Sequence, residues 1–258
     1  MDPIVNHNQA AAAHQHDFFG AKSWQGTFGN GADYNDVRGS ATTCREQKDT
    51  AAYWAPSLVF TSGPKAGQRV PPVQFTAYYR AFASQSSGQG RPFPPDTRLV
   101  ATDEAGYGLT GWTCGQASRQ AAVQGGVGFI PDCTGEDGSP GNTLTAHVNF
   151  PSCWNGVLPN HTPGDVGDTR DNANYAYPAN KTACPAAFPI EMVQLRETIQ
   201  YAYTGNGADV ALTSDHGMRS GTEMHVDFWN TWDQAGFEDM VRTCITVASA
   251  YSAARCDP

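Results

Sequence analysis

The feature that most constrains this chain is a set of short segments in which apolar and polar residues alternate. Between residues 144 and 150, every second position is apolar: Leu144, Ala146, Val148 and Phe150. Successive side chains of a β-strand point to opposite faces, so this period of two indicates a strand with one buried face. We predict further strands at residues 57–60, 73–79, 98–102, 190–195, 198–203 and 224–229. Stretches rich in Gly, Pro, Asn and Asp separate them, which predicts a mainly β protein, a jelly-roll-like β-sandwich.

A segment near the C-terminal end has the period of an α-helix instead. Its apolar residues fall at positions i, i+3, i+4, i+7, i+8 and i+11: Phe237, Met240, Val241, Cys244, Ile245 and Ala248. Asp233 precedes them and can cap the first turn. We therefore predict one amphipathic helix that begins after Asp233 and packs on a sheet, with Cys244 and Cys256 able to fasten its end.

The cysteines indicate disulfides. Seven are spread through the chain without a Cys-x-x-Cys pair, which argues against a zinc knuckle or a thioredoxin-like motif. The polar segments at about 20–50, 83–96, 115–142 and 155–183 are long enough to need such fastening. An odd number leaves at least one thiol that is free or pairs outside the chain, and we expect this to be Cys44. Low charge and the sequons at Asn160 and Asn180 suit an exported protein, so we expect secretion, with Met1 placed where a leader was removed.

Length and composition limit the domain organisation and the classes of partner that the chain can bind. A chain of 258 residues can form one domain and nothing forces a division, so we expect a single domain of catalytic type over residues 1–258. Only 16% of residues are charged and the net charge is −9, so no basic surface is available for nucleic acid. Apolar runs such as residues 57–60 are far shorter than the roughly 20 residues of a membrane helix. We expect a monomer with neither nucleic acid nor membrane as partner.

His14-Gln15-His16 is the first candidate for chemistry. On an extended strand, imidazoles at i and i+2 point the same way and form half of a zinc or copper site, which a third histidine or a carboxylate would complete. The spacing fits two structural, hydrogen-bonded histidines equally well.

The second candidate is the predicted strand at residues 224–229, where His225, Asp227 and Trp229 share one face. Such a face suits a sugar site, in which the indole stacks on the sugar ring and the carboxylate handles protons. The alternation is also typical of a buried strand whose His and Asp bond each other. Just upstream, Asp215-His216-Gly217 lies in a Gly- and Ser-rich loop, where an Asx turn is the simpler interpretation.

Both candidates belong to a longer series of motifs that spans nearly the whole chain. In order, the series is Asp2-Pro3-Ile4-Val5, His14-x-His16 with Phe19-Gly20, Thr42-Thr43-Cys44, Ala52-Tyr53-Trp54-x-Pro56-x-Leu58, Phe150-Pro151-Ser152-Cys153-Trp154-Asn155-Gly156, Ala176-Tyr177-Pro178, Cys184-Pro185 and His225-x-Asp227-Phe228-x-Asn230-x-Trp232-Asp233. It resembles a domain-of-unknown-function family of secreted fungal and actinobacterial proteins, some of them fused to WSC or ricin-type lectin modules. The resemblance implies secretion and a polysaccharide target, and it names no reaction.

The chain departs from the family pattern at two positions. The family usually has a second cysteine close to the one that matches Cys44, and this chain lacks it. The family also has a histidine two residues before Ala-Tyr-Pro, where this chain has Asn174. The second departure argues against any site that needs a fourth histidine.

The leading hypothesis is a secreted glycoside hydrolase that cleaves a cell-wall or extracellular polysaccharide. The reaction needs an acid and a base or nucleophile, which we assign to Asp227 and, if the N-terminus folds beside the last strand, to Asp2. No cofactor is expected. Side chains expected to orient the substrate or tune these acids are His14, His16 and His225, and those expected to contact the sugar are Trp229, Asn230 and Asp215.

Two alternatives stay open. In one, His14, His16 and His225 hold copper or zinc for oxidative or hydrolytic cleavage or for metal capture. In the other, the chain is a non-catalytic glycan-binding module. The acidic balance favours neutral or cationic glycans in every case. The site itself requires that the N-terminal segment lie against the last strand, so that the three histidines and Asp227 face one cleft.

Overall fold

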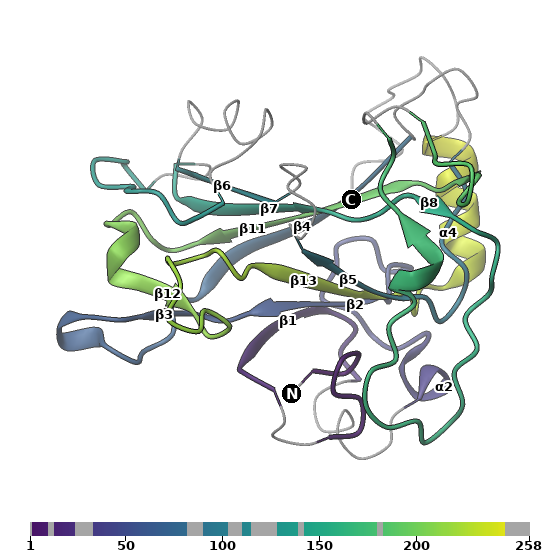
Figure 1. Cartoon of the computed structure of the whole chain (residues 1–258), viewed down its shortest axis with the longest axis horizontal. Helices are drawn as coiled ribbons and strands as arrows, with labels where there is room; N and C mark the ends of the chain where they lie inside the picture. Colours follow the sequence, from purple (N-terminus) through teal and green to yellow (C-terminus); the bar gives the residue numbers. More distant parts are fainter. Residues whose placement is uncertain are drawn as a thin grey trace.

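Two four-stranded antiparallel sheets, packed face to face, form the centre of the computed structural model (Figure 1). The first sheet has the order β1 (His16–Gly20), β2 (Ala52–Pro56), β13 (His225–Trp229) and β5 (Arg98–Thr102). The second has the order β4 (Pro72–Arg80), β11 (Gln194–Tyr201), β7 (Leu144–Asn149) and β6 (Thr110–Cys114). The structure describes residues 2–9, 13–23, 33–81, 90–102, 110–114, 128–138, 142–179 and 183–245. The chain crosses repeatedly between the sheets, and the predicted mainly β sandwich is confirmed.

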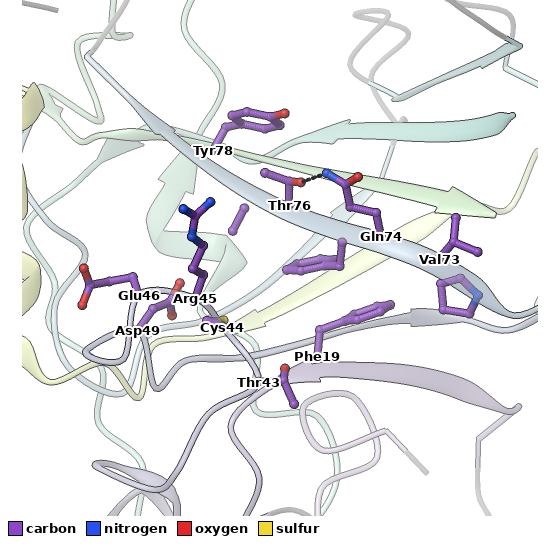
Figure 2. A pocket seen from close by; sticks show the side chains of 13 residues that line it. Phe19, Thr43, Cys44, Arg45, Glu46, Asp49, Val73, Gln74, Thr76 and Tyr78 are labelled. Atoms are coloured by element: carbon purple, nitrogen blue, oxygen red, sulfur yellow. Dashed lines mark hydrogen bonds between the residues drawn. The ribbon is translucent and has the colours of Figure 1, made fainter. Parts of the chain in front are cut away.

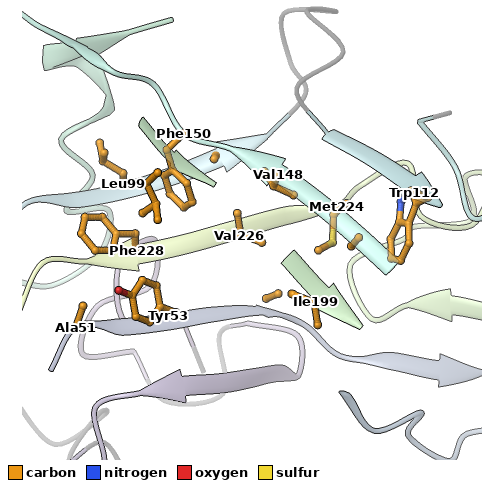
Figure 3. Packing of buried hydrophobic residues seen from close by; sticks show 14 of the residues in the cluster. Ala51, Tyr53, Leu99, Trp112, Val148, Phe150, Ile199, Met224, Val226 and Phe228 are labelled. Carbon is orange, nitrogen blue, oxygen red and sulfur yellow. The ribbon is translucent and has the colours of Figure 1, made fainter. Parts of the chain in front are cut away.

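The facing sides of the two sheets enclose the main hydrophobic core (Figure 3). Alternation decides which side chains enter it: Val226 and Phe228 of β13 point inward, as do Ala146 and Val148 of β7. Phe228 stacks on Tyr53 at a centroid distance of 5.6 Å. Each large apolar side chain buried in this way contributes about 1.5–3 kcal/mol to folding.

The outer face of the first sheet carries a second, smaller core. Trp54, Val100 and Trp229 point away from the sandwich, and Ile4 and Val37 cover them. Val37 belongs to the short helix α2 (Tyr34–Val37), and Ile4 belongs to the N-terminal segment. The backbone carbonyl oxygen of Ile4 accepts a hydrogen bond from Thr169 N–H at 3.0 Å. The N-terminal segment and α2 therefore lie on the side of the first sheet opposite to the second sheet (Figure 1).

Shorter elements extend both ends of the sandwich. They are a two-stranded sheet of β3 (Leu58–Phe60) and β12 (Val210–Leu212), a three-stranded sheet of β10 (Ile190–Glu191), β8 (Cys153–Trp154) and β9 (Tyr175–Ala176), and 3₁₀ turns at Gly63–Lys65, Asn172–Asn174 and Gly207–Asp209. The predicted C-terminal helix is α4 (Gln234–Met240), followed by a π-helical turn at Val241–Ile245. Asp233 caps it by accepting from Gly236 N–H at 3.4 Å, and Ala248 lies outside the described residues. No helix in the described ranges is long and apolar enough to span a bilayer.

Strand boundaries differ from the sequence prediction in two ways. The strand expected at residues 190–195 is divided between β10 and the start of β11, and β11 continues through most of the strand expected at 198–203. The polar side chain of Glu197 points into the core between Leu195 and Ile199 and hides this continuity. Strands that the sequence did not predict are β1, β2 and β6 of the central sheets and the short strands β8, β9 and β12. All five residues of β2 are buried, so it has no polar face and no period of two.

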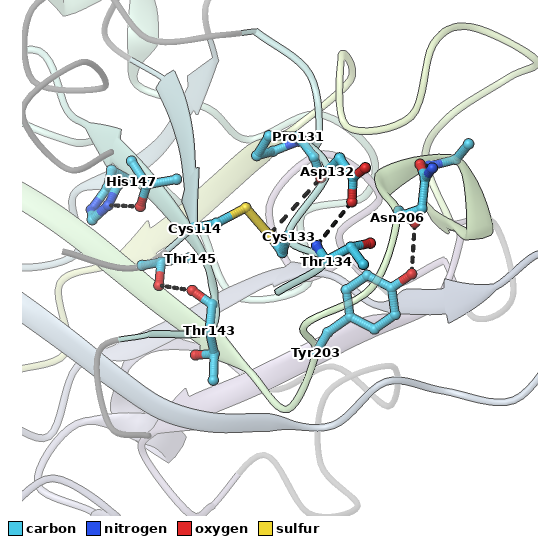
Figure 4. Close-up of a disulfide and its surroundings, with 12 residues drawn as sticks. Cys114, Pro131, Asp132, Cys133, Thr134, Thr143, Thr145, His147, Tyr203 and Asn206 are labelled. Atoms are coloured by element: carbon cyan, nitrogen blue, oxygen red, sulfur yellow. Dashed lines mark hydrogen bonds between the residues drawn. A yellow bond between two sulfur atoms is a disulfide. The ribbon is translucent and has the colours of Figure 1, made fainter. Parts of the chain in front are cut away.

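Disulfides fasten two of the long segments, as predicted. Cys114 pairs with Cys133 at the end of β6 (Figure 4), and Cys153 pairs with Cys184 across the segment at 155–183. Cys44 is the free cysteine of the described residues. Cys244 is disulfide-bonded, and its expected partner Cys256 lies outside the described residues.

Acidic side chains are buried between the sheets. Asp49 accepts a hydrogen bond from the Tyr53 hydroxyl at 2.9 Å, and Tyr53 is 2.7 Å from the Tyr79 hydroxyl. Burial raises the pKa of Asp49 to about 7. Glu197 is also buried, its two carboxylate oxygens have no hydrogen-bond partner among the described residues, and burial followed by the charge of Asp49 raises its pKa well above the usual range. The protonated acid is therefore the favoured form of Glu197.

Because folded Glu197 keeps its proton, stability should fall as pH rises. Above pH 4.5, the unfolded value, the unfolded chain releases this proton and the folded chain does not. The free energy of unfolding should then decrease by about 1.4 kcal/mol per pH unit for each such group. Glu197→Gln removes the effect, so urea unfolding of this variant between about pH 4.5 and pH 8 should show a shallower decline.

Glu238→Gln is the matched control because Glu238 is exposed on α4. It should keep the wild-type pH dependence. An unchanged slope in Glu197→Gln would show that Glu197 ionises normally.

Candidate metal centre

Three imidazole rings meet on the outer face of the first sheet. His14 Nε2 lies 3.3 Å and His16 Nε2 lies 3.4 Å from His225 Nε2. The rings of His14 and His16 are 4.3 Å apart between centroids, and one nitrogen atom of each histidine lies within 4.8 Å of the other two. These three are the group of potential metal ligands found in the described part of the chain.

Strand register explains why these residues meet. His16 begins β1 and pairs with Pro56 of β2, while Trp54 of β2 pairs with Asp227 of β13. β2 therefore lies between the two histidine-bearing strands, and the N-terminal segment reaches the last strand over the outer face of the sheet, where Ile4 and Trp229 belong to one apolar cluster. Strands two places apart are roughly 10 Å apart, a gap that two imidazole side chains can close from either side.

The tautomer of His225 directs a lone pair at the common centre. His225 Nδ1–H donates to the Glu223 carbonyl oxygen at 3.1 Å, so the neutral ring carries its lone pair on Nε2. Burial lowers the pKa of His225, and burial together with the neighbouring His225 lowers the pKa of His14 to about 4. Both rings are thus neutral at physiological pH, the state that binds a metal ion.

Two of the three nitrogen separations match those around a tetrahedral metal ion, and the third is within 4.8 Å. Zinc–imidazole bonds of about 2.0–2.1 Å at tetrahedral angles place the nitrogen atoms about 3.3–3.4 Å apart. The two Nε2 separations at His225 are 3.3 Å and 3.4 Å. A backbone carbonyl that accepts from the second ring nitrogen, as Glu223 does for His225, is the usual support of a metal-bound histidine.

Asp227 is a buried acid beside the histidines. It has no exposed surface, and neither of its carboxylate oxygens has a hydrogen-bond partner among the described residues. Oδ2 lies 4.0 Å from His225 Nε2. Burial, then the charges of Asp2 and Glu197, raise the pKa of Asp227 well above its usual range. A buried carboxylate without a partner is costly, and a cation at the three histidines would compensate for it.

Asp2 lies close to the same centre. Its Oδ1 accepts hydrogen bonds from the N–H groups of Ile4 and Val5, each at 3.0 Å, and the residue is buried. Its charge partly opposes the lowering by burial of the pKa values of His14 and His225, and it adds to the rise by burial in the pKa of Asp227. The structure thus brings together all five residues that the sequence suggested for catalysis.

A pocket of about 500 Å³ opens at the histidine cluster. It is lined by His14, Thr102, Ser214, His216, Thr222, Glu223, Met224 and His225. Asp215, expected to contact a sugar, instead accepts from the N–H groups of Leu212 and Gly221 at 2.8 and 2.7 Å. It organises the loop that forms one wall of the pocket.

Trp229 ends β13 and Asn230 follows it, at the end of the strand away from His225, and neither residue lines the pocket. Both are fully buried. Trp229 Nε1 donates to Asp96 at 2.7 Å, and the Arg98 guanidinium lies 4.4 Å from the centroid of its ring. Asn230 donates to the Phe93 carbonyl oxygen at 2.9 Å. The expectation that they contact a sugar does not fit side chains without exposed surface.

The sequence analysis missed a second pocket, of about 650 Å³, along β4 (Figure 2). Every residue from Pro72 to Tyr78 lines it, so it follows the open edge of the strand and not one face. Asp49 lies at this pocket, but Tyr53 already donates to its carboxylate. No spacing in the sequence marks Asp49 or Glu197, because tertiary packing alone buries them.

The neutral state of the rings can be measured by NMR. In ring-¹⁵N spectra of metal-free protein, we expect His14 to titrate near pH 4 and not near 6.5, because burial and His225 disfavour its charge. His225 should be the Nδ1–H tautomer. In His225→Ala, the titration of His14 should move to higher pH, and a wild-type midpoint near 6.5 would contradict the geometry.

Comparison with known proteins identifies the family. A search of curated proteins and a search of solved structures give no significant match. The family model described as "Domain of unknown function (DUF1996)" matches residues 2–232, a range that contains both sheets and all five residues of the centre. The chain therefore belongs to the DUF1996 family.

Proposed function

We propose that this protein is a metal-dependent enzyme that holds zinc or copper at His14, His16 and His225 and cleaves an extracellular polysaccharide. The observation that carries the proposal is the convergence of three imidazoles, with the Nε2 atoms of His14 and His16 3.3 and 3.4 Å from that of His225. Three imidazoles beside an open pocket match the ligand set of catalytic zinc and copper sites.

The residues around the ligands have distinct tasks in this proposal. The Glu223 carbonyl group holds the His225 ring in the tautomer that binds metal. Asp227 balances the charge of the ion from the buried side, and the pocket admits the substrate on the other. A bound ion would supply Lewis-acid or redox activation of the substrate.

Secretion and a glycan substrate are part of the proposal. Two disulfides suit an oxidising compartment. The resemblance to secreted proteins that are fused to lectin modules favours a polysaccharide, and the net charge of −9 disfavours a polyanionic one.

Metal content tests the proposal directly. Wild-type protein purified without chelator and analysed by mass spectrometry for metals should contain about one zinc or copper ion per chain. His14→Ala, His16→Ala and His225→Ala should each lose most of it because one ligand of three is removed. Met218→Ala, an exposed side chain of the neighbouring loop, should keep it. A metal-free wild type that also fails to take up zinc or copper would overturn the proposal.

A glycoside hydrolase that uses carboxylates alone is the second candidate. The raised pKa of Asp227 favours it, because a general acid must be protonated at working pH. Asp2 would be its partner, and the histidines would orient the substrate.

A polysaccharide screen with product analysis separates the candidates. For the metal centre, EDTA should abolish cleavage and added zinc or copper should restore it. For the carboxylate mechanism, cleavage should survive EDTA and fall by a factor of at least about 100 in Asp227→Asn and Asp2→Asn. Retention of a glycan without products would instead indicate a binding module.

A further inference from the structure

The Asp215-His216-Gly217 motif has a defined place in the structure that the metal ligands do not explain. It lies in the loop between β12 and β13, and Asp215 accepts hydrogen bonds from three backbone N–H groups, those of Leu212, Gly221 and Glu223. Gly221 has a φ of +84°, and a Cβ atom there would lie 2.6 Å from Ile130. The loop is therefore anchored to the sandwich and holds a fixed shape.

This loop presents one histidine to the pocket in a single orientation. The carboxylate Oε2 of Glu223 accepts from the His216 backbone N–H at 2.9 Å and from its Nδ1–H at 2.8 Å. The ring is 80% exposed, so burial does not hold it in place and Glu223 does. In the neutral ring, Nε2 then carries the lone pair on the side away from Glu223. His216 and Glu223 line the same pocket as His14 and His225.

The other walls of the pocket define the chemistry of its ligand. Three side chains carry hydroxyl groups, Thr102, Ser214 and Thr222. The described lining contains the Glu223 carboxylate and neither lysine nor arginine. Phosphate, sulfate and uronate groups would meet a carboxylate there without a cationic side chain to pair with. The volume of about 500 Å³ lies within the range of small-molecule sites.

We propose that this pocket binds an uncharged, hydroxyl-rich ligand, a segment of neutral oligosaccharide, and that His216, oriented by Glu223, hydrogen-bonds one of its hydroxyl groups. The Nε2 atom of His216 accepts from that hydroxyl, while its Nδ1–H stays bonded to Glu223. The ligand would be the substrate of the proposed metal centre. Its cleavage rests on that proposed function, whereas its binding to the pocket does not.

The test is a titration followed by NMR of both metal-free and zinc-loaded protein, and neutral and anionic probes are compared on the metal-free protein, in which no cation lies at the histidines. The probes are neutral hexasaccharides of glucose, mannose, xylose and N-acetylglucosamine, each β-1,4-linked, and the hexamers of glucuronate and mannuronate. At least one neutral probe should shift the signals of Thr102, Ser214 and Thr222, with the anionic hexamers at least about tenfold weaker. No shift with any neutral probe, or equal binding of the anionic ones, would overturn the assignment.

Variants test the role of His216. His216→Ala and Glu223→Ala should each weaken binding of the neutral probe by about tenfold, the effect expected for one lost hydrogen bond. Glu223→Gln keeps an oxygen that can accept from His216 and should lose less. Met218→Ala, exposed on the same loop, should bind as the wild type does. Wild-type affinity in His216→Ala would exclude the proposed contact.

Metal content of each variant keeps the two proposals apart. His216→Ala should retain zinc, and loss of zinc would make His216 a ligand and overturn its assignment to the substrate. If the wild type binds no metal but a neutral probe still binds and loses about tenfold in His216→Ala, the metal centre is wrong and the oligosaccharide pocket is supported.

Discussion

The pairing of β2 with both β1 and β13 is the interaction on which the rest of the structure depends. It places His14 within 3.3 Å of His225, although 211 positions separate the two residues in the chain. β2 is buried at every residue and contributes to both faces of the sheet: Tyr53 to the main core, Trp54 to the smaller core. Backbone hydrogen bonds on its two edges set the registers of β1 and β13, and with them which side chains share the outer face.

The N-terminal segment covers that outer face and so determines the pKa values of the residues in the site. The N-terminal segment buries Trp54 and Trp229 under Ile4 and brings Asp2 next to Asp227. In such surroundings the charged form of any isolated group is disfavoured, which lowers the pKa of His14 and raises that of Asp227. The neutral imidazoles can bind a metal cation, and Asp227 can ionise once that positive charge is present. The site therefore suits a metal cation.

The alternation of apolar and polar residues was sufficient to predict a strand where polar residues occupy one of its faces. β5 has the predicted bounds, and β7 and β13 differ from prediction by one residue at one end. The capping role of Asp233 also follows from sequence, since it acts within three residues. Pattern failed at β2, where both faces are buried, and at β11, where Glu197 occupies a core position. Glu223 had no sequence signal either, because its bonds to His216 depend on how the loop returns to β13.

The sequence by itself determined the class of fold, the disulfide-rich character, and which short motifs carry histidines and carboxylates on one side of a strand. These properties depend on neighbours a few residues apart, where the strand period and capping rules apply. Tertiary structure alone decided that His14, His16 and His225 meet, that Asp227 is buried with no hydrogen-bond partner among the described residues, and that Trp229 faces a core and not a substrate. Distances of a few ångströms between residues about 200 positions apart are set by strand order and register, and no local pattern encodes them.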